Sequence, residues 1–80
     1  MDAYTLKKKK DTKEFHLFKG VMTPQGCNSA VSSICEKMKN SESENNVFTC
    51  YNENEARTKC AEIGREVCGT CVSHLYSTDN

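Results

Sequence analysis

The sequence lacks several features that mark large classes of proteins. It contains no run of about 20 apolar residues of the kind that spans a membrane. No apolar stretch follows its first basic residues, so we expect no signal peptide and a cytoplasmic location. It also shows no internal repeat and no glycine-rich phosphate loop. Its formal net charge is zero, which disfavours non-specific binding to nucleic acid.

What the chain has in excess is cysteine, six in 80 residues. The length predicts a single domain covering residues 1–80, and a core of this size supplies only ~3–5 kcal/mol of net stability. An additional cross-link, such as a bound metal ion or disulfides, is therefore expected. In a cytoplasmic protein thiols stay reduced and clustered cysteines more often bind metal, whereas a secreted protein would pair them as disulfides. The cysteines are Cys27, Cys35, Cys50, Cys60, Cys68 and Cys71.

The first part of the chain predicts a β-hairpin. Apolar and polar residues alternate over residues 3–10 and 13–19, which is typical of two strands joined by a short turn. One face would carry Tyr4, Leu6, Phe15 and Leu17, and the other His16 and Phe18. Residues 20–28 contain two glycines and a proline and are expected to form a loop.

The middle of the chain predicts a helix, a polar connection and a third strand. Apolar residues recur at helical spacing over residues 29–39, which would turn Cys35 toward the core or toward a metal at its edge. Residues 40–46 are all polar, so we expect them to form a mobile connection. Residues 47–51 are rich in β-forming side chains.

The last third predicts a second helix over residues 54–67, capped by Asn52 or Asn54, with Cys60 as a small buried residue in its apolar stripe. Residues 72–76 then form a short strand or a helical turn. We therefore expect an α+β fold in the order ββαβα, in which a small antiparallel sheet packs against two helices.

The motif with the clearest chemistry is Cys68-Gly69-Thr70-Cys71. Two cysteines at this spacing can hold one zinc ion, close into a redox disulfide, or remain plain thiols. Zinc needs four donors, which histidine nitrogen and cysteine thiolate provide. Candidates for the other two positions are His16, which is otherwise an exposed strand histidine, and three further cysteines: Cys27, Cys35 and Cys50.

Three short motifs together resemble a known group of sequences. They are His16-Leu17-Phe18, then Cys35 with its neighbours, then Cys68-Gly69-Thr70-Cys71 followed by Leu75-Tyr76. This pattern is similar to that of small, mostly uncharacterised zinc-binding proteins encoded by phages and mobile elements. The resemblance implies zinc ligands at His16, Cys35, Cys68 and Cys71.

The chain departs from this pattern in two places. Glu36 stands where the pattern has glycine, and the helix expected over residues 54–67 is inserted before the final pair. Both departures concern Cys35, for which Cys27 or Cys50 would be the substitute.

The sequence suggests binding rather than catalysis. No nucleophile–base arrangement is visible, and the final cysteine pair is expected to follow a helix C-terminus, unlike the pair of a thioredoxin-like enzyme. We therefore expect a small non-catalytic protein. From the resemblance it would bind and inhibit a host protein or complex, for example as an anti-CRISPR protein.

Two alternatives remain. The first is a zinc-stabilised nucleic-acid-binding module, with Tyr4, Phe15 or Phe18 stacking on bases and a basic hairpin formed by Lys7, Lys8, Lys9 and Lys10. An edge strand solvated by lysines is the other explanation for this basic run. The second alternative is a secreted protein stapled by disulfides.

Overall fold

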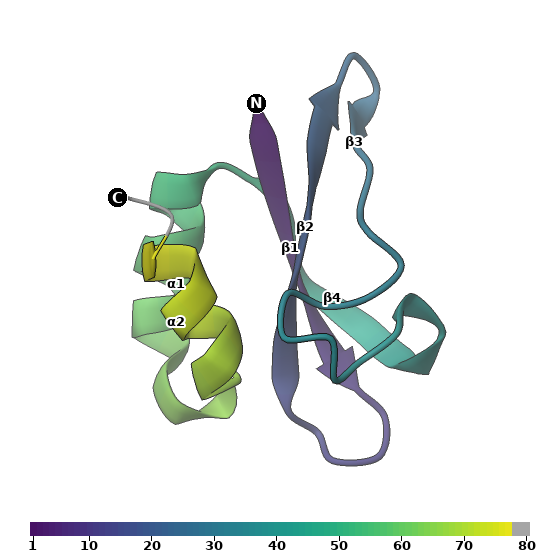
Figure 1. Cartoon of the computed structure of the whole chain (residues 1–80), viewed down its shortest axis with the longest axis vertical. Helices are drawn as coiled ribbons and strands as arrows, with labels where there is room; N and C mark the ends of the chain where they lie inside the picture. Colours follow the sequence, from purple (N-terminus) through teal and green to yellow (C-terminus); the bar gives the residue numbers. More distant parts are fainter. Residues whose placement is uncertain (78–80) are drawn as a thin grey trace.

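A four-stranded antiparallel sheet carries two helices on one side (Figure 1). The computed structural model describes residues 1–77, and the predicted α+β class is confirmed. The strands are β1 (Asp2–Lys9), β2 (Phe15–Thr23), β3 (Gly26–Cys27) and β4 (Ser43–Tyr51). The helices are α1 (Glu53–Ile63) and α2 (Gly69–Ser77), with short 3₁₀ turns η1 (Asn40–Glu42) and η2 (Gly64–Glu66).

Strand β1 lies inside the sheet, whose order is β3-β2-β1-β4. The predicted hairpin is present, with Leu6 opposite Leu17 and Lys8 opposite Phe15. On its other side β1 pairs with β4, where Tyr4 lies opposite Tyr51 and the register is irregular at three places. Because β1 has a partner on each edge, its backbone groups are satisfied within the sheet.

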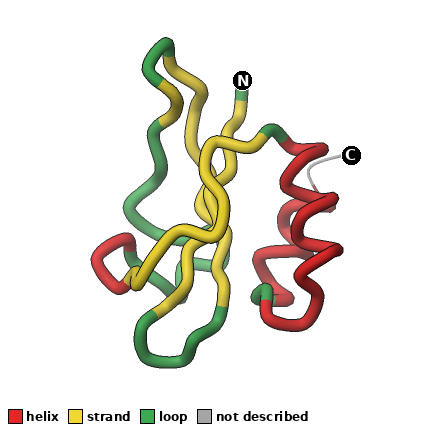
Figure 2. The backbone as a smooth tube through the Cα atoms, turned by 180° about the vertical axis from the view of Figure 1, so that it is seen from behind, coloured by secondary structure: helices red, strands yellow, loops and turns green. Residues whose placement is uncertain are grey.

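The sheet is buried on both faces, which the alternation of the hairpin did not predict. Tyr4, Leu6 and Leu17 belong to the core shared with the helices, as expected. On the other face Phe18 is fully buried and His16 is 2% exposed, so the expectation of an exposed strand histidine was wrong. The second face is covered because residues 28–39 cross the sheet opposite the helices (Figures 1 and 2).

The helix predicted over residues 29–39 does not form. Two backbone hydrogen bonds tie this segment to β2, as Ala30 N–H donates to Lys19 and Ile34 N–H donates to Leu17. Others close turns within it, such as the bond from Ser33 N–H to the carbonyl of Met38. Serine, valine and isoleucine are modest helix formers, so bonds to β2 outweigh a weak local preference. Val31 is 79% exposed while Met38 is fully buried, so the apolar spacing marks no common face.

Gly20 allows this segment to approach β2. A β-carbon at this position would lie 1.7 Å from the backbone oxygen of Asn28, far inside van der Waals contact. The loop expected over residues 20–28 is shorter than predicted, because β2 continues to Thr23 and β3 begins at Gly26. The polar connection over residues 40–46 is also ordered, as it forms η1 and the first part of β4.

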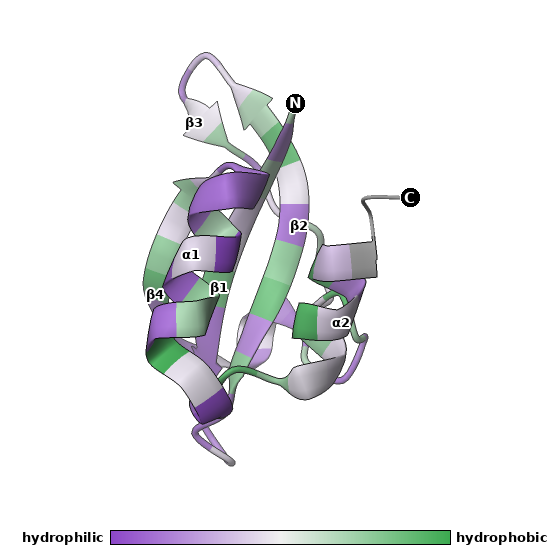
Figure 3. Ribbon diagram, turned by 90° about the vertical axis from the view of Figure 1, so that its left-hand side faces the viewer, coloured by the Kyte–Doolittle hydropathy of each residue, from purple (hydrophilic) through white to green (hydrophobic). Residues whose placement is uncertain are grey.

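Helix α1 begins at a capping box. The Asn52 side chain accepts a hydrogen bond from Glu55 N–H, and the Glu55 carboxylate accepts one from Asn52 N–H. The helix ends at Ile63, earlier than predicted, because Gly64 follows with a φ of 81°. Ala56 and Cys60 are buried against the sheet, as expected for Cys60, and the outer surface of α1 is largely hydrophilic (Figure 3).

The chain closes with α2 rather than with a strand. Cys71 and Leu75, one helical turn apart, are fully buried in the core. The cysteine pair therefore lies at the start of a helix, which corrects the expectation that it follows a helix end. With α1 and α2 packed on the same face, this element completes the helical layer (Figure 2).

A disulfide joins the two outermost strands. Cys27 on β3 and Cys50 on β4 are bonded, with 5.6 Å between their Cα atoms. These strands are at opposite ends of the pairing order, so the sheet must curl until its edges meet. The bond therefore closes the curled sheet covalently on the side away from α1 and α2.

Candidate metal centre

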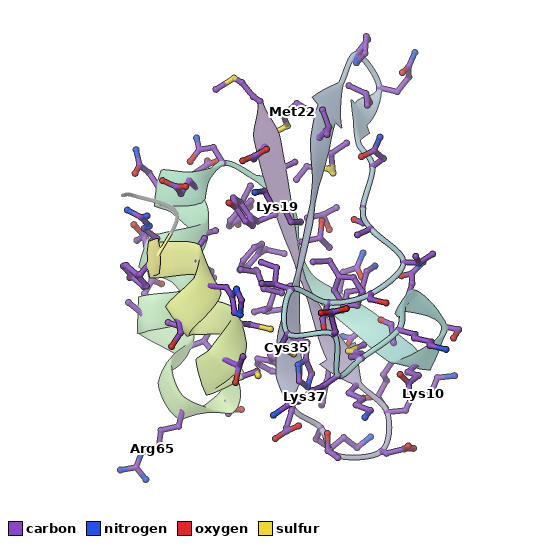
Figure 4. All side chains as sticks on the ribbon, in the orientation of Figure 1. Lys10, Lys19, Met22, Cys35, Lys37 and Arg65 are labelled. Atoms are coloured by element: carbon purple, nitrogen blue, oxygen red, sulfur yellow. A yellow bond between two sulfur atoms is a disulfide. The ribbon has the colours of Figure 1, made fainter. Side chains whose placement is uncertain are left out.

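The candidate metal centre is built on the outer edge of β2, on the side that β1 does not pair. Leu17 N–H donates to Cys71 Sγ at 3.3 Å, and Cys68 N–H donates to the carbonyl of Phe15 at 2.8 Å. Ile34 N–H donates to the carbonyl of Leu17 at 2.8 Å, which brings Cys35 to the same place. The free edge of one strand thus gathers two distant segments, and Cys35 lies between the strands and α2 (Figure 4).

Four donor atoms converge at this edge, one each from His16, Cys35, Cys68 and Cys71, all within 4.8 Å of one another. Cys35 Sγ is 3.3 Å from His16 Nδ1 and 3.9 Å from Cys68 Sγ. Cys71 Sγ is 3.8 Å from His16 Nδ1. In a tetrahedral zinc site the donors are about 3.5–3.8 Å apart, given the usual Zn–S and Zn–N bond lengths. The donor set and its spacing therefore fit zinc.

The orientation of His16 favours coordination through Nδ1. This nitrogen faces the sulfur atoms, while Nε2 lies 3.3 Å from Glu14 Oε1. A carboxylate on the second ring nitrogen is the usual outer partner of a metal-binding histidine, because it fixes the ring and its tautomer. Sequence reasoning missed Glu14. The sequence did contain a signal for this contact. Glu14 and His16 are two residues apart in an extended segment, which puts both side chains on the same side of the chain.

The thiols of the cluster differ in how readily they lose a proton. Burial raises the pKa of Cys35, but hydrogen bonds from Ser33, the Lys37 backbone, Cys71 and His16 outweigh it and lower that pKa to about 6. Burial also raises the pKa of Cys71, and the nearby Cys35 thiolate adds to this effect although Leu17 N–H opposes it. Of these two thiols, Cys35 therefore loses its proton more readily, and metal binding would favour the thiolate form of both.

Glu36 does not remove Cys35 from the cluster, although it stands where the resembling proteins have glycine. Its φ is 63°, the left-handed conformation that glycine adopts without strain. A glycine at this position would adopt the same backbone conformation without strain. This turn carries the backbone back over Cys35, so that the Lys37 backbone forms a hydrogen bond to its sulfur.

Replacing Glu36 with glycine is expected to stabilise the metal-loaded protein by about 1 kcal/mol, because a β-carbon is disfavoured at this φ. The urea midpoint of unfolding measures the change. Glu36→Ala is the matched control, since it removes the same carboxylate but keeps the β-carbon. An equal gain in both variants would assign the effect to charge and contradict the backbone explanation.

Neither of the two substitutes predicted for Cys35 takes part in the cluster. Cys27 and Cys50 are consumed by their disulfide, so neither is available as the alternative to Cys35. The four remaining cysteines are free, and three of them belong to the cluster. A scaffold stapled by three disulfides is therefore not what this chain forms. Cys60 is the remaining free thiol and is 4% exposed in the core.

Of the three aromatic residues expected to stack on bases, only Phe15 is partly exposed. Tyr4 and Phe18 are fully buried, so neither can stack on a nucleobase. Lys8 and Lys13 form ion pairs with Glu44 on β4, and Lys7 donates to Asn46 on the same strand. The other explanation for the lysine run, an edge strand solvated by lysines, is wrong because β1 lies between β2 and β4 inside the sheet. Lys7 and Lys8 instead contact β4 across the strand pair.

The fold and the cluster together define a class, an α+β protein with a candidate Cys₃His metal centre. Comparisons with protein-family models, curated proteins and solved structures found no match. The resemblance to phage proteins therefore has no support from a matching family. Among the described residues, no helix has the length and apolar character needed to cross a membrane.

Proposed function

We propose that this protein is a small, non-catalytic binding protein whose fold is held by one zinc ion. The observation that carries the proposal is the convergence of one imidazole nitrogen and three sulfurs within 4.8 Å. Two of these residues, His16 and Cys71, are almost fully buried, and each has a hydrogen-bond partner suited to a metal ligand. Zinc is the metal most often bound by such a mixed sulfur and nitrogen set.

The geometry supports a structural rather than a catalytic role for the metal. Four protein donors fill a tetrahedral site, whereas a catalytic zinc keeps one position for water or substrate. The donors come from β2, the 28–39 segment, and α2 with the residue before it, three parts of the chain that are distant in sequence. A zinc ion here would tie all three together.

We propose the binding role because of the small size of the chain, which also presents some apolar side chains to solvent. Apolar side chains are exposed at Val31 (79%), Val21 (50%) and Tyr76 (47%), on three different parts of the chain. We propose a protein partner, and inhibition of a host protein or complex by a phage-encoded chain is the form that the sequence resemblance suggests. The cytoplasmic location stays a prediction.

Native mass spectrometry of the purified protein tests the metal assignment. We expect one zinc ion per chain, lost on treatment with a chelator, and a polypeptide mass lowered by two hydrogens for the Cys27–Cys50 disulfide. A Cys68→Ser/Cys71→Ser variant should bind no zinc, whereas Cys60→Ala should bind it normally. A metal-free wild type, or a zinc-loaded double variant, would reject the proposal.

The partner is tested with the same proteins as bait. The zinc-loaded wild type should recover a stoichiometric protein partner that the Cys68→Ser/Cys71→Ser variant does not. Recovery of nucleic acid with a steep salt dependence would instead support the nucleic-acid-binding module.

A secreted protein is the second candidate, and one observation favours it. The Cys27–Cys50 disulfide belongs to a kind of bond that persists mainly in oxidising compartments. The two candidates differ in where the bond forms. Rapid acid quenching and alkylation of cells that express the chain would report Cys27 and Cys50 as thiols in the first case and as a disulfide in the second.

A further inference from the structure

The sulfurs of the cluster are not equally accessible. Cys71 is fully buried and His16 is 2% exposed, whereas Cys35 and Cys68 are each partly exposed. The Sγ atoms of these two partly exposed cysteines are 3.9 Å apart. The outer side of the candidate metal centre is therefore formed by two partly exposed residues with adjacent sulfurs.

Cys68 also lines a hollow of about 440 Å³ that Cys35 does not line. The hollow lies between the β1–β2 turn and the start of α2, and its wall includes Lys37, Arg65 and Gly69. Lys37 and Arg65 mark the same end of the molecule (Figure 4). A small oxidant in this hollow would contact Cys68, whose Sγ is 3.9 Å from Cys35 Sγ.

The backbone allows these two sulfurs to come together. A disulfide needs a sulfur–sulfur distance of about 2.05 Å, so the pair must close by roughly 2 Å. Cys35 lies in the irregular 28–39 segment and is followed by Glu36, whose left-handed φ of 63° can relax when the turn moves. Cys71, by contrast, is held inside α2 and accepts a hydrogen bond from Leu17 N–H.

We propose that Cys35 and Cys68 are a redox-active pair, which hydrogen peroxide converts into a disulfide with release of the zinc ion. This inference rests on the proposed zinc site, and it names a chemical modification that regulates that site. The buried residues His16 and Cys71 remain as only two ligands, too few for stable zinc binding.

The chemistry balances with peroxide as the only added reactant. The Cys68 thiolate attacks one peroxide oxygen, the O–O bond breaks, and Cys68 sulfenic acid and hydroxide are formed. The Cys35 thiolate then attacks the Cys68 sulfur, forms the S–S bond and expels a second hydroxide. Two electrons pass from the sulfurs to peroxide, and the two hydroxides take up two protons to give water.

The product would keep the 28–39 segment attached to α2. Zinc connects Cys35 to Cys68 in the reduced state, and the new disulfide connects the same two residues in the oxidised state. Oxidation would thus free His16 and Cys71 without detaching the segment that carries Cys35. This distinguishes oxidation from chelation, which removes every link within the cluster.

The experiment is a titration of the zinc-loaded wild type with hydrogen peroxide. A chromogenic zinc chelator records metal release, and non-reducing peptide mass mapping records the bonds. We expect one zinc released for each Cys35–Cys68 disulfide formed, and dithiothreitol with added zinc should reduce that bond and restore zinc binding. The Cys60→Ala variant should behave as wild type, because Cys60 lies outside the cluster.

Other bonding patterns would overturn the inference. These are a Cys68–Cys71 or Cys35–Cys71 disulfide, sulfinic acid without a disulfide, or zinc retained while cysteines outside the cluster oxidise. In the Cys35→Ser variant, which lacks the second thiol, dimedone should trap Cys68 as its sulfenic acid. If the wild type binds no zinc at all, the proposed function fails first, and peroxide treatment of that metal-free protein still tests whether Cys35 and Cys68 pair.

Discussion

Removal of the metal is expected to abolish the cooperative fold. Structural zinc contributes ~10–16 kcal/mol toward folding in zinc-finger peptides, whereas a core of this size supplies only ~3–5 kcal/mol of net stability. The loss should therefore exceed what the core can offset. After treatment with a chelator, we expect the thermal transition followed by circular dichroism to disappear and to return when zinc is added back.

Two variants serve as controls for this experiment. Cys71→Ser removes a fully buried member of the cluster and should resemble the chelated wild type even in excess zinc. Cys60→Ala removes a buried thiol outside the cluster and should keep a zinc-dependent transition. An apo-protein that still unfolds cooperatively at the temperature of the loaded protein would show that zinc does not hold this fold.

Loss of the disulfide should have the second largest effect. Cys27 and Cys50 are 23 residues apart in sequence, and cross-linking a loop of this length stabilises a protein by about 3 kcal/mol through the entropy of the unfolded chain. For the zinc-loaded Cys27→Ala/Cys50→Ala variant we expect the melting temperature to fall by roughly 12–24 °C. Zinc stoichiometry should not change, because neither residue is in the cluster.

The disulfide prediction has an internal check. Treating the wild type with a reductant in the presence of excess zinc should produce the same shift as the double variant. Equal melting temperatures with and without the bond would show that the curled sheet holds its edges together by packing alone.

Those parts of the fold that depend on local signals could be predicted from the sequence. The alternation of residues 3–19 predicted the β1–β2 hairpin, and the asparagine followed by acidic residues predicted the start of α1. The segment 28–39 was not predictable in this way. Its helical spacing of apolar residues competes with hydrogen bonds to β2, and these depend on the glycine at position 20, distant in sequence.

The candidate site shows the same division. The resemblance pointed to the four residues that the structure brings together, while the residues alone left Cys27 and Cys50 as alternatives to Cys35. Those two pair because β3 and β4 meet when the sheet curls, a long-range event with no local signal. Glu14 and Ser33, which contact His16 and Cys35, were missed although each lies two residues from its partner.

The two cross-links are nested along the chain, and this determines how the protein would respond to a pulling force. The disulfide spans residues 27 and 50, inside the interval between His16 and Cys71 that zinc would close. An unfoldase that pulls on either end can extend only the residues before His16 and after Cys71 until the metal is lost. Even then the residues between Cys27 and Cys50 carry no tension, so threading through a narrow pore would have to accommodate a double-stranded loop.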